Sequence, residues 1–312
     1  MRLLNNKTTI DFMAKSRIMA VVSGCLLLVV LGGLLLRGVH GGLDFTGGLL
    51  VEAVFTKPLA TETVRQQLQD QGLAEASVQT LGDPKTFALR LPQQLAEGVG
   101  NEQARKQVVL ALQHADAQVK INRIEYVGPK VGQELARKGI MGFVLALLGI
   151  AIYVWVRFEW HLAIGAVAAT FHDVALTMAI FAFTPIPFDL TSLAALLTVV
   201  GYSVNDTIVI FDRMRENIRR QRKLSLREVA NMSVNQTLSR TILTAFATLL
   251  SVLGILFFGG ESLRGFALAL AVGIVVGTYS SIFVAMATAI TTGLNREVFN
   301  QKPKRQDDGA RV

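Results

Sequence analysis

The stretch IMAVVSGCLLLVVLGGLLL, residues 18–36, decides the class of fold. It holds no charged residue, and its length is close to the roughly 20 residues that cross the hydrocarbon core of a membrane as a helix. A cleaved signal peptide would have a shorter apolar centre and a small-residue cleavage site, whereas this run ends in three leucines followed by Arg37. We therefore expect residues 18–36 to form a retained membrane-spanning helix.

The composition of the whole chain is typical of a polytopic α-helical membrane protein. Of its 312 residues, 51% are hydrophobic and only 17% are charged, and the mean hydropathy is +0.44. These values exclude a disordered chain, and the single cysteine, Cys25, excludes a disulfide-stabilised scaffold. Five further apolar runs follow at residues 139–156, 162–183, 190–211, 241–258 and 266–290. The sequence thus predicts six spans, the last five forming a bundle over residues 139–290.

The distribution of basic residues predicts the orientation of these spans. Of the 31 Lys and Arg residues, eighteen fall in segments that are cytoplasmic if the N-terminus lies inside, whereas the short outer loops contain only Arg264. The positive-inside rule then places residues 1–17 and 291–312 in the cytoplasm and the long segment 37–138 in the periplasm. The net charge of +8 is explained by topology and lipid contact, so nucleic-acid binding is not favoured.

The outer segment, residues 37–138, is polar enough and long enough to fold as a domain in water. Its periodicity predicts strands at 49–55, 76–81, 86–91 and 119–127, and helices at 61–72 and 101–115. This β-α-β-β-α-β order is the ferredoxin-like arrangement, in which two helices cover one face of a four-stranded antiparallel sheet. The segment has no cysteine, and we expect a binding or lever domain.

Three carboxylates lie inside the predicted spans or directly at their ends: Asp173, Asp189 and Asp206. An ionised carboxylate at the centre of a spanning helix costs about 2.5–3.5 kcal/mol on insertion scales, so such residues usually face a bundle interior or an aqueous path. Asp189 follows two prolines at the start of a helix, where helix capping is the favoured interpretation. Asp173 and Asp206 are therefore the candidate functional acids.

Asp206 lies in the run Gly-Tyr-Ser-Val-Asn-Asp-Thr, residues 201–207. The small and hydrogen-bonding side chains of this run, Asn205 among them, do not suit a lipid-facing surface. Arg240 opens the next predicted span near the same depth, so an extended Arg240 side chain is expected to reach Asp206. The pair predicts a proton site, with Asn205 in the same proton pathway, and the alternative is a static ion pair that only fixes helix packing.

His172 directly precedes Asp173 in the third predicted span. Adjacent helical residues point about 100° apart, so we expect these side chains to share a polar pathway without forming a simple pair. A buried histidine is as often a packing residue as a proton carrier, and both interpretations of His172 stay open. In the last span, Gly273 and Gly277 form a G-x-x-x-G pattern that indicates close helix packing.

Glycines occur at both junctions between the outer domain and the membrane. Gly47 and Gly48 precede the first predicted strand, and Gly128 and Gly132 follow the last one. Glycine adopts backbone angles that are closed to other residues, so a hinge and a plain tight turn are both compatible with these positions. Gly-bearing segments at both ends suit an outer domain that tilts.

Several motifs together give nearly the whole chain a resemblance to the SecF family of protein-export membrane proteins. They are Asp-Phe-Thr-Gly-Gly at residues 44–48, Val-Gly-Pro-Lys-Val-Gly at 127–132, His-Asp-Val at 172–174, Val-Gly-Tyr-Ser-Val-Asn-Asp-Thr at 200–207, Phe-Asp-Arg at 211–213 and Asn-Gln-Thr-Leu-Ser-Arg-Thr at 235–241. The resemblance implies a six-span half of a transporter similar to the resistance-nodulation-division (RND) exporters. It also implies that Asp206 and Arg240 belong to a proton pathway and that Asp44 lies at the junction with the outer domain.

The resemblance further implies a set of partners. SecD would supply the other half of the transporter, and the pair would assist export through the SecYEG channel of the bacterial inner membrane, with YajC as an additional partner. The expected substrates are unfolded preproteins and the expected coupling ion is the proton, with no cofactor. Two alternatives stay open: half of an RND-type small-molecule exporter, and a passive scaffold that stabilises the channel. An enzyme is not expected, because no nucleophile–base set, phosphate loop or metal-ligand spacing occurs.

Overall fold

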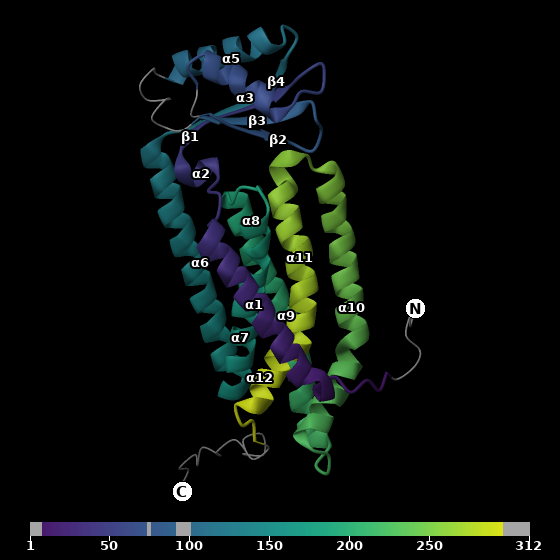
Figure 1. Ribbon diagram of the computed structural model, residues 1–312. Coiled ribbons are helices and arrows are strands. Elements are labelled where there is room, and N and C mark those ends of the chain that lie inside the picture. The colour runs from purple at the N-terminus through teal and green to yellow at the C-terminus, as the bar shows by residue number, and fades with distance from the viewer. Residues whose placement is uncertain (1–7, 74–75, 92–100, 296–312) are drawn as a thin grey trace, which may run out of the picture.

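The computed structural model describes residues 8–73, 76–91 and 101–295. A domain with a β-sheet stands on one end of a bundle of long helices (Figure 1). Within the described residues, six helical segments are long and apolar enough to cross a membrane, as the sequence predicts. These segments are Met13–Arg37, Pro129–Arg157, Trp160–Phe183, Leu190–Arg220, Leu226–Phe258 and Arg264–Thr291.

The six segments divide into a central group and a peripheral group. In the third, fourth and sixth segments, 50%, 56% and 50% of the apolar window is buried inside the protein, against 17%, 6% and 11% in the first, second and fifth. The central segments are α7 (Trp160–Thr177) with α8 (Ala179–Phe183), α9 (Leu190–Arg220), and α11 (Arg264–Ser280) with α12 (Met286–Thr291). The peripheral helices are α1 (Ser16–Arg37), α6 (Pro129–Arg157) and α10 (Leu226–Phe258).

Several helices continue beyond the apolar runs that predict them. Helix α6 begins at Pro129, because proline at the first helical position has the backbone angle that a helix needs. The predicted outer boundary at residue 138 therefore falls inside α6. Helix α10 begins at Leu226 after a capping box made by Ser225 and Glu228, so Arg240 lies inside α10 and does not open it.

The last span is not a regular α-helix throughout. A π-helical segment, Ser281–Ala285, separates α11 from α12. Such segments are rare and often occur at functional sites. This one packs against α7, where a side-chain carbon on Gly165 would collide with the carbonyl oxygen of Ala285.

The outer domain contains a four-stranded antiparallel sheet with the strand order β2-β3-β1-β4. Its elements are β1 (Gly48–Val54), α3 (Thr61–Asp70), β2 (Ser77–Thr80), β3 (Thr86–Leu91), α5 (Asn101–Ala115) and β4 (Lys120–Val127). This is the element order that the sequence predicts, and α3 and α5 cover one face of the sheet (Figure 1).

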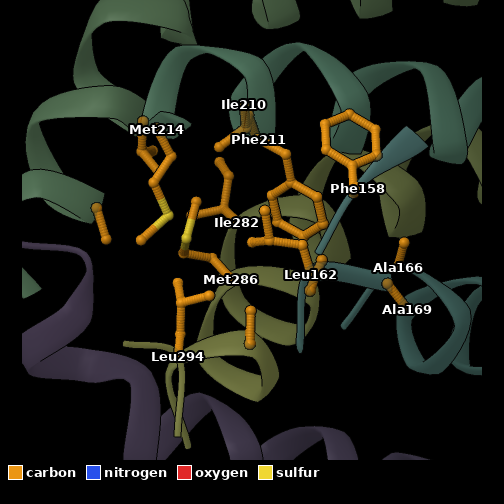
Figure 2. Packing of buried hydrophobic residues seen from close by; sticks show 14 of the residues in the cluster. Phe158, Leu162, Ala166, Ala169, Ile210, Phe211, Met214, Ile282, Met286 and Leu294 are labelled. Atoms are coloured by element: carbon orange, nitrogen blue, oxygen red, sulfur yellow. The ribbon is translucent and has the colours of Figure 1, made fainter. Parts of the chain in front are cut away.

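The described residues form one hydrophobic core in the outer domain and two hydrophobic clusters in the helix bundle. In the outer domain, alternate residues of β1 and β3 point toward the helices, as in the opposed pairs Val51–Leu89 and Ala53–Phe87. In the membrane bundle, the largest cluster gathers side chains of the central helices with Phe158, as Figure 2 shows. Its labelled members are Phe158, Leu162, Ala166, Ala169, Ile210, Phe211, Met214, Ile282, Met286 and Leu294.

Candidate functional site

Asp173 lies where the three central spans meet. It belongs to α7, and its exposed fraction is 0%. Its Oδ2 atom accepts hydrogen bonds from the hydroxyls of Ser203 in α9 and Ser280 in α11, the second at 2.6 Å. Its Oδ1 atom lies 2.9 Å from Nδ1 of His172. Asp173 is thus a fully buried carboxylate with both oxygens bonded, and it joins α7, α9 and α11.

Two glycines allow α11 to approach α9 closely enough for these bonds. A side-chain carbon on Gly277 would lie 3.2 Å from Cβ of Ser203, and one on Gly273 would collide with Val199. The close packing predicted from the G-x-x-x-G pattern is therefore confirmed. Ser280 lies one turn beyond Gly277, so this close approach also brings its hydroxyl to Asp173.

The prediction that His172 and Asp173 form no simple pair is wrong. Their Cα–Cβ directions diverge, but rotation about the side-chain bonds brings Nδ1 of the imidazole to the carboxylate. This rotamer is favoured because a buried polar group without a hydrogen bond is energetically costly. Nε2 of His172 is buried with no hydrogen-bond partner among the described residues. The imidazole also lies beside Tyr279, with ring centroids 6.0 Å apart, and the Tyr279 hydroxyl lies 2.8 Å from Oγ of Ser23 in α1.

Asp206 differs from Asp173 in that its carboxylate is not satisfied. The residue is 4% exposed, and its Oδ2 atom is buried without a hydrogen-bond partner in the described part of the chain. The hydroxyls of Thr207 in α9 and Thr241 in α10 are buried without such a partner as well. An unpaired buried polar atom costs about 1–3 kcal/mol, which makes this region unusual within a closely packed bundle.

The predicted ion pair between Asp206 and Arg240 is absent from the structure, which describes both residues. The Arg240 side chain is exposed, although it is near enough for its charge to attract the Asp206 carboxylate. Arg240 lies within α10, on the same exposed side as Thr244. The role of Asp206 and Arg240 in a proton pathway remains a prediction.

Asn205, the predicted neighbour of the proton site, does not join the buried cluster. Its side chain is exposed and continues a stripe of small and polar residues along α9. The stripe consists of Thr191, Ala194, Thr198, Gly201 and Asn205, all exposed in this chain. Their alternating three- and four-residue spacing places them on one side of the helix.

At the junction with the outer domain, the glycines have different roles. Gly47 and Gly48 have positive φ angles of 67° and 116°, which favour glycine, so the chain turns sharply between α2 (Leu43–Thr46) and β1. Gly128 caps α6 with an extended backbone, and Gly132 lies inside α6, where a side-chain carbon would be 3.3 Å from the Gly47 amide nitrogen. Gly132 thus also permits close packing, and the hinge remains a prediction for Gly47, Gly48, Gly128 and Gly132.

Asp44, at the same junction, contacts the helix that carries Asp206. Its Oδ2 atom accepts a hydrogen bond of 3.0 Å from the amide of Leu190, the first residue of α9. Asp189, the residue before it, accepts from the amide of Ser192 at 2.7 Å, which confirms its predicted capping role.

Neither Ser280 nor the link from Asp44 to Leu190 is predicted from the sequence. For Ser280 a signal exists, since Gly273, Gly277 and Ser280 have helical spacing and share one face of α11. For the link there is none, because the two residues are 146 positions apart. No metal-binding group of three or more His, Cys, Asp or Glu residues occurs within the described ranges.

Comparison with known proteins places this arrangement in a family. Residues 107–295 match the family model described as protein export membrane protein SecD/SecF, C-terminal, which covers more than half of the 312 residues. The chain belongs to the SecD/SecF family. Among SecD/SecF proteins, the protein translocase subunit SecF of Pseudomonas aeruginosa is 45% identical over 93% of this chain and 93% of its own length. SecF of Vibrio alginolyticus is 42% identical over 99% of this chain and 98% of its own length.

Solved structures of SecDF have the same fold. The crystal structure of SecDF, a translocon-associated membrane protein from Thermus thermophilus, matches 94% of this chain with a TM-score of 0.84 and 35% identity. SecDF in a super-membrane-facing form matches 96% of this chain with a TM-score of 0.70. This SecD/SecF chain spans 39% of the first SecDF chain and 40% of the second. The resemblance noted from the sequence and the six-span fold are thereby confirmed.

Proposed function

We propose that this SecD/SecF protein is an auxiliary subunit of the Sec machinery that uses the proton-motive force to promote late translocation and release of preproteins. The observation that carries the proposal is the buried, unpaired carboxylate of Asp206 in a spanning helix. A charge at the centre of a spanning helix costs about 2.5–3.5 kcal/mol on insertion scales. No described residue lowers this cost by donating a hydrogen bond to Oδ2 of Asp206. Uptake of a proton removes this charge, so the free energy of a buried Asp206 depends on whether a proton is bound, as a proton carrier requires.

Arg240 supplies the second charge in this mechanism. Its guanidinium is exposed, and a change in the packing of α9 against α10 would bring it to the Asp206 carboxylate. A proton and a guanidinium then compete for the same carboxylate, because either one neutralises it. This competition couples proton binding to two arrangements of α9 and α10.

Asp173 and His172 are predicted from the sequence to lie in the proton pathway, and the proposed role for them there is that of positioning residues. Asp173 has no exposed surface and bonds to Ser203 and Ser280, so it holds α7, α9 and α11 in register. His172 fixes the second carboxylate oxygen. The Asp206 region can then rearrange without separating the central helices.

The driving force suffices for such a change. At a proton-motive force of about 150 mV, one proton yields about 3.5 kcal/mol, scaling from about 2.3 kcal/mol per 100 mV. Because about 1.4 kcal/mol corresponds to a tenfold change in an equilibrium constant, one proton shifts a two-state orientation of the outer domain more than a hundredfold. No covalent chemistry is required.

A SecD partner is proposed to cover the exposed polar face of α9 and α10. The stripe on α9 described above is accompanied on α10 by the exposed residues Arg240, Thr244, Ala247 and Ser251. Small and polar side chains at membrane depth suit contact with another helix bundle better than contact with lipid. Since this chain spans only 39% of the SecDF chain, SecDF contains a further region that is long enough to supply such a bundle.

The remaining partners and the orientation complete the proposal. We place both termini in the cytoplasm of a bacterial cell and the outer domain in the periplasm, because the extension of α9 and α10 opposite the sheet domain is rich in arginine. SecYEG, YajC and unfolded preproteins are the proposed further partners, and the proton is the coupling ion.

The test is Asp206→Asn in vesicles that contain the assembled SecD, SecF and SecYEG proteins. We expect the variant to fold and assemble but to lose the part of export that depends on the proton gradient. Asp212→Asn is the matched control, because Asp212 lies on the same helix and pairs with Arg157 where both side chains are more than 40% exposed. Normal gradient-driven export by Asp206→Asn, with Arg240→Ala also unimpaired, would instead indicate a passive scaffold.

A further inference from the structure

The outer end of α9 is held by carboxylates from two parts of the chain. Asp189 is the helix's own cap and accepts from the Ser192 amide, whereas Asp44 comes from α2, next to the outer domain, and accepts from the Leu190 amide. The first amide groups of a helix have no partner within the helix and carry partial positive charge. The Leu190 amide thus forms a hydrogen bond to a charged group outside its own helix.

The segment before α2 is joined to the same helix end by backbone contacts. The Gly42 amide donates to the Phe188 carbonyl oxygen at 2.6 Å, and the Phe188 amide donates to the His40 carbonyl oxygen at 2.8 Å. A side-chain carbon on Gly42 would lie 2.7 Å from Cβ of Asp189, so only glycine fits there. Residues 40–44 and the start of α9 therefore form one packed unit.

The outer domain begins directly after this unit. Only Gly47 separates α2 from β1, and Arg90 of β3 donates from Nη1 to the Gly41 carbonyl oxygen at 3.3 Å. Burial lowers the pKa of the Arg90 guanidinium, and the nearby Asp189 carboxylate opposes this shift. The sheet is thus attached to the helix end both through the chain and through Arg90.

The other part of α9 carries the candidate proton site. Ser203 and Asp206 lie thirteen and sixteen residues from Leu190, which corresponds to about 20 and 24 Å along a helix. A helix transmits axial displacement because its backbone bonds keep its length fixed. A shift of α9 at Asp206 therefore reaches Leu190 with little loss.

We infer that Asp44 is a positioning residue that couples movement of α9 to the outer domain through its bond to the Leu190 amide. The inference rests on the proposed function, since it assigns the connection between the proton site and the outer domain. Without this bond, α9 still moves when Asp206 is protonated, but the helix is then joined to residues 40–44 only through the segment before it, by the backbone bonds of Phe188 and the packing of Gly42 on Asp189, so a smaller part of the movement reaches β1.

Two variants break this bond from opposite sides. Asp44→Ala removes the acceptor. Leu190→Pro removes the donor at the first helical position, where proline is well tolerated, and the extended backbone of Asp189 suits a residue before proline. Each variant has a matched control: Asp44→Asn keeps an oxygen acceptor, and Leu190→Ala loses the side chain but keeps the amide.

The experiment measures two quantities in vesicles with the assembled complex: proton flux, and export that depends on the proton gradient. We expect Asp44→Ala and Leu190→Pro to retain proton flux but to show reduced gradient-dependent export, whereas Asp44→Asn and Leu190→Ala retain both. A merely structural role of Asp44 would lower flux and export together.

The inference is overturned if Asp44→Ala or Leu190→Pro exports like its matched control. It is also overturned if flux and export fall together in the assembled variants. If Asp44→Ala does not assemble, the comparison of Leu190→Pro with Leu190→Ala in proton flux and gradient-dependent export is sufficient to test the inference. Failure of the proposed function is a separate outcome, because Asp206→Asn would then retain gradient-dependent export.

Discussion

At the scale of single residues, two buried aspartates have opposite environments. Asp173 accepts hydrogen bonds from two other helices, whereas Oδ2 of Asp206 accepts none from the described residues. The two carboxylates are both buried, and they differ in their hydrogen bonds, which is the basis on which different roles are proposed for them above. Both residues are predicted from the sequence as functional acids. Their difference is not predicted, because hydropathy indicates depth in the membrane but not which side chains of other helices form hydrogen bonds to a carboxylate.

We predict that Asp173→Ala destabilises the helix bundle. The change leaves the buried Ser203 hydroxyl and His172 imidazole without their acceptor, at about 1–3 kcal/mol for each unsatisfied group. Ser280 loses less, because its hydroxyl also lies 3.2 Å from the Gly277 carbonyl oxygen. Thermal unfolding in detergent should show a lower midpoint than for the wild type.

Asp212→Ala is the control for this prediction. Asp212 pairs with Arg157, and both side chains are more than 40% exposed, so its loss should cost less than about 1 kcal/mol. If Asp173→Ala unfolds like the wild type but stops proton flux, Asp173 carries protons and does not act as a positioning residue.

At the scale of elements, the packing of α11 on α9 depends on glycine. Gly273 faces Val199 and Gly277 faces Ser203, so the two helices approach closely enough for Ser280 to reach Asp173. The G-x-x-x-G spacing predicts this contact because residues four apart lie on one helix face. Helix ends are less predictable, since α6, α9 and α10 continue beyond their apolar runs through polar residues that hydropathy assigns to loops.

We predict that Gly273→Ala weakens this packing. The added methyl group meets Val199, and overpacking of this kind costs about 1–3 kcal/mol. The matched control is Gly254→Ala in α10, where no atom apart from the adjacent backbone of the helix itself lies within 4 Å of the added carbon and a slight gain in stability is expected. Both are measured by thermal unfolding in detergent, and equal midpoints would contradict the packing argument.

At the scale of the whole molecule, the outer domain rests on the helix bundle at more than one place. Apart from the Asp44 junction, Arg123 of β4 donates a hydrogen bond to Ser262, which lies in the turn between α10 and α11. Arg123 is also held by Glu125 of the same strand. Because that ion pair lies within the outer domain, the contact with Ser262 can open while Arg123 keeps a charged partner.

We predict that Arg123→Ala widens the range of outer-domain orientations. Spin labels at His114 in α5 and Ala247 in α10, in a chain with Cys25→Ser, should give a broader distance distribution than without the substitution. Arg65→Ala is the control, because the ion pair that the structure describes for Arg65 is with Glu62 of the same helix, and both side chains are more than 40% exposed. An unchanged distribution for Arg123→Ala would show that the junction alone orients the domain.

The sequence by itself determined the six spans, the order of strands and helices in the outer domain, and the carboxylates that lie at membrane depth. These features depend on hydropathy and periodicity, which act between residues that are close along the chain. Only the tertiary structure decided that Asp173 joins three helices, that Arg240 is exposed and forms no ion pair with Asp206, both of which the structure describes, and that Asp44 binds the start of α9. Such contacts depend on which helices become neighbours and how their side chains rotate, and neither is encoded in local spacing.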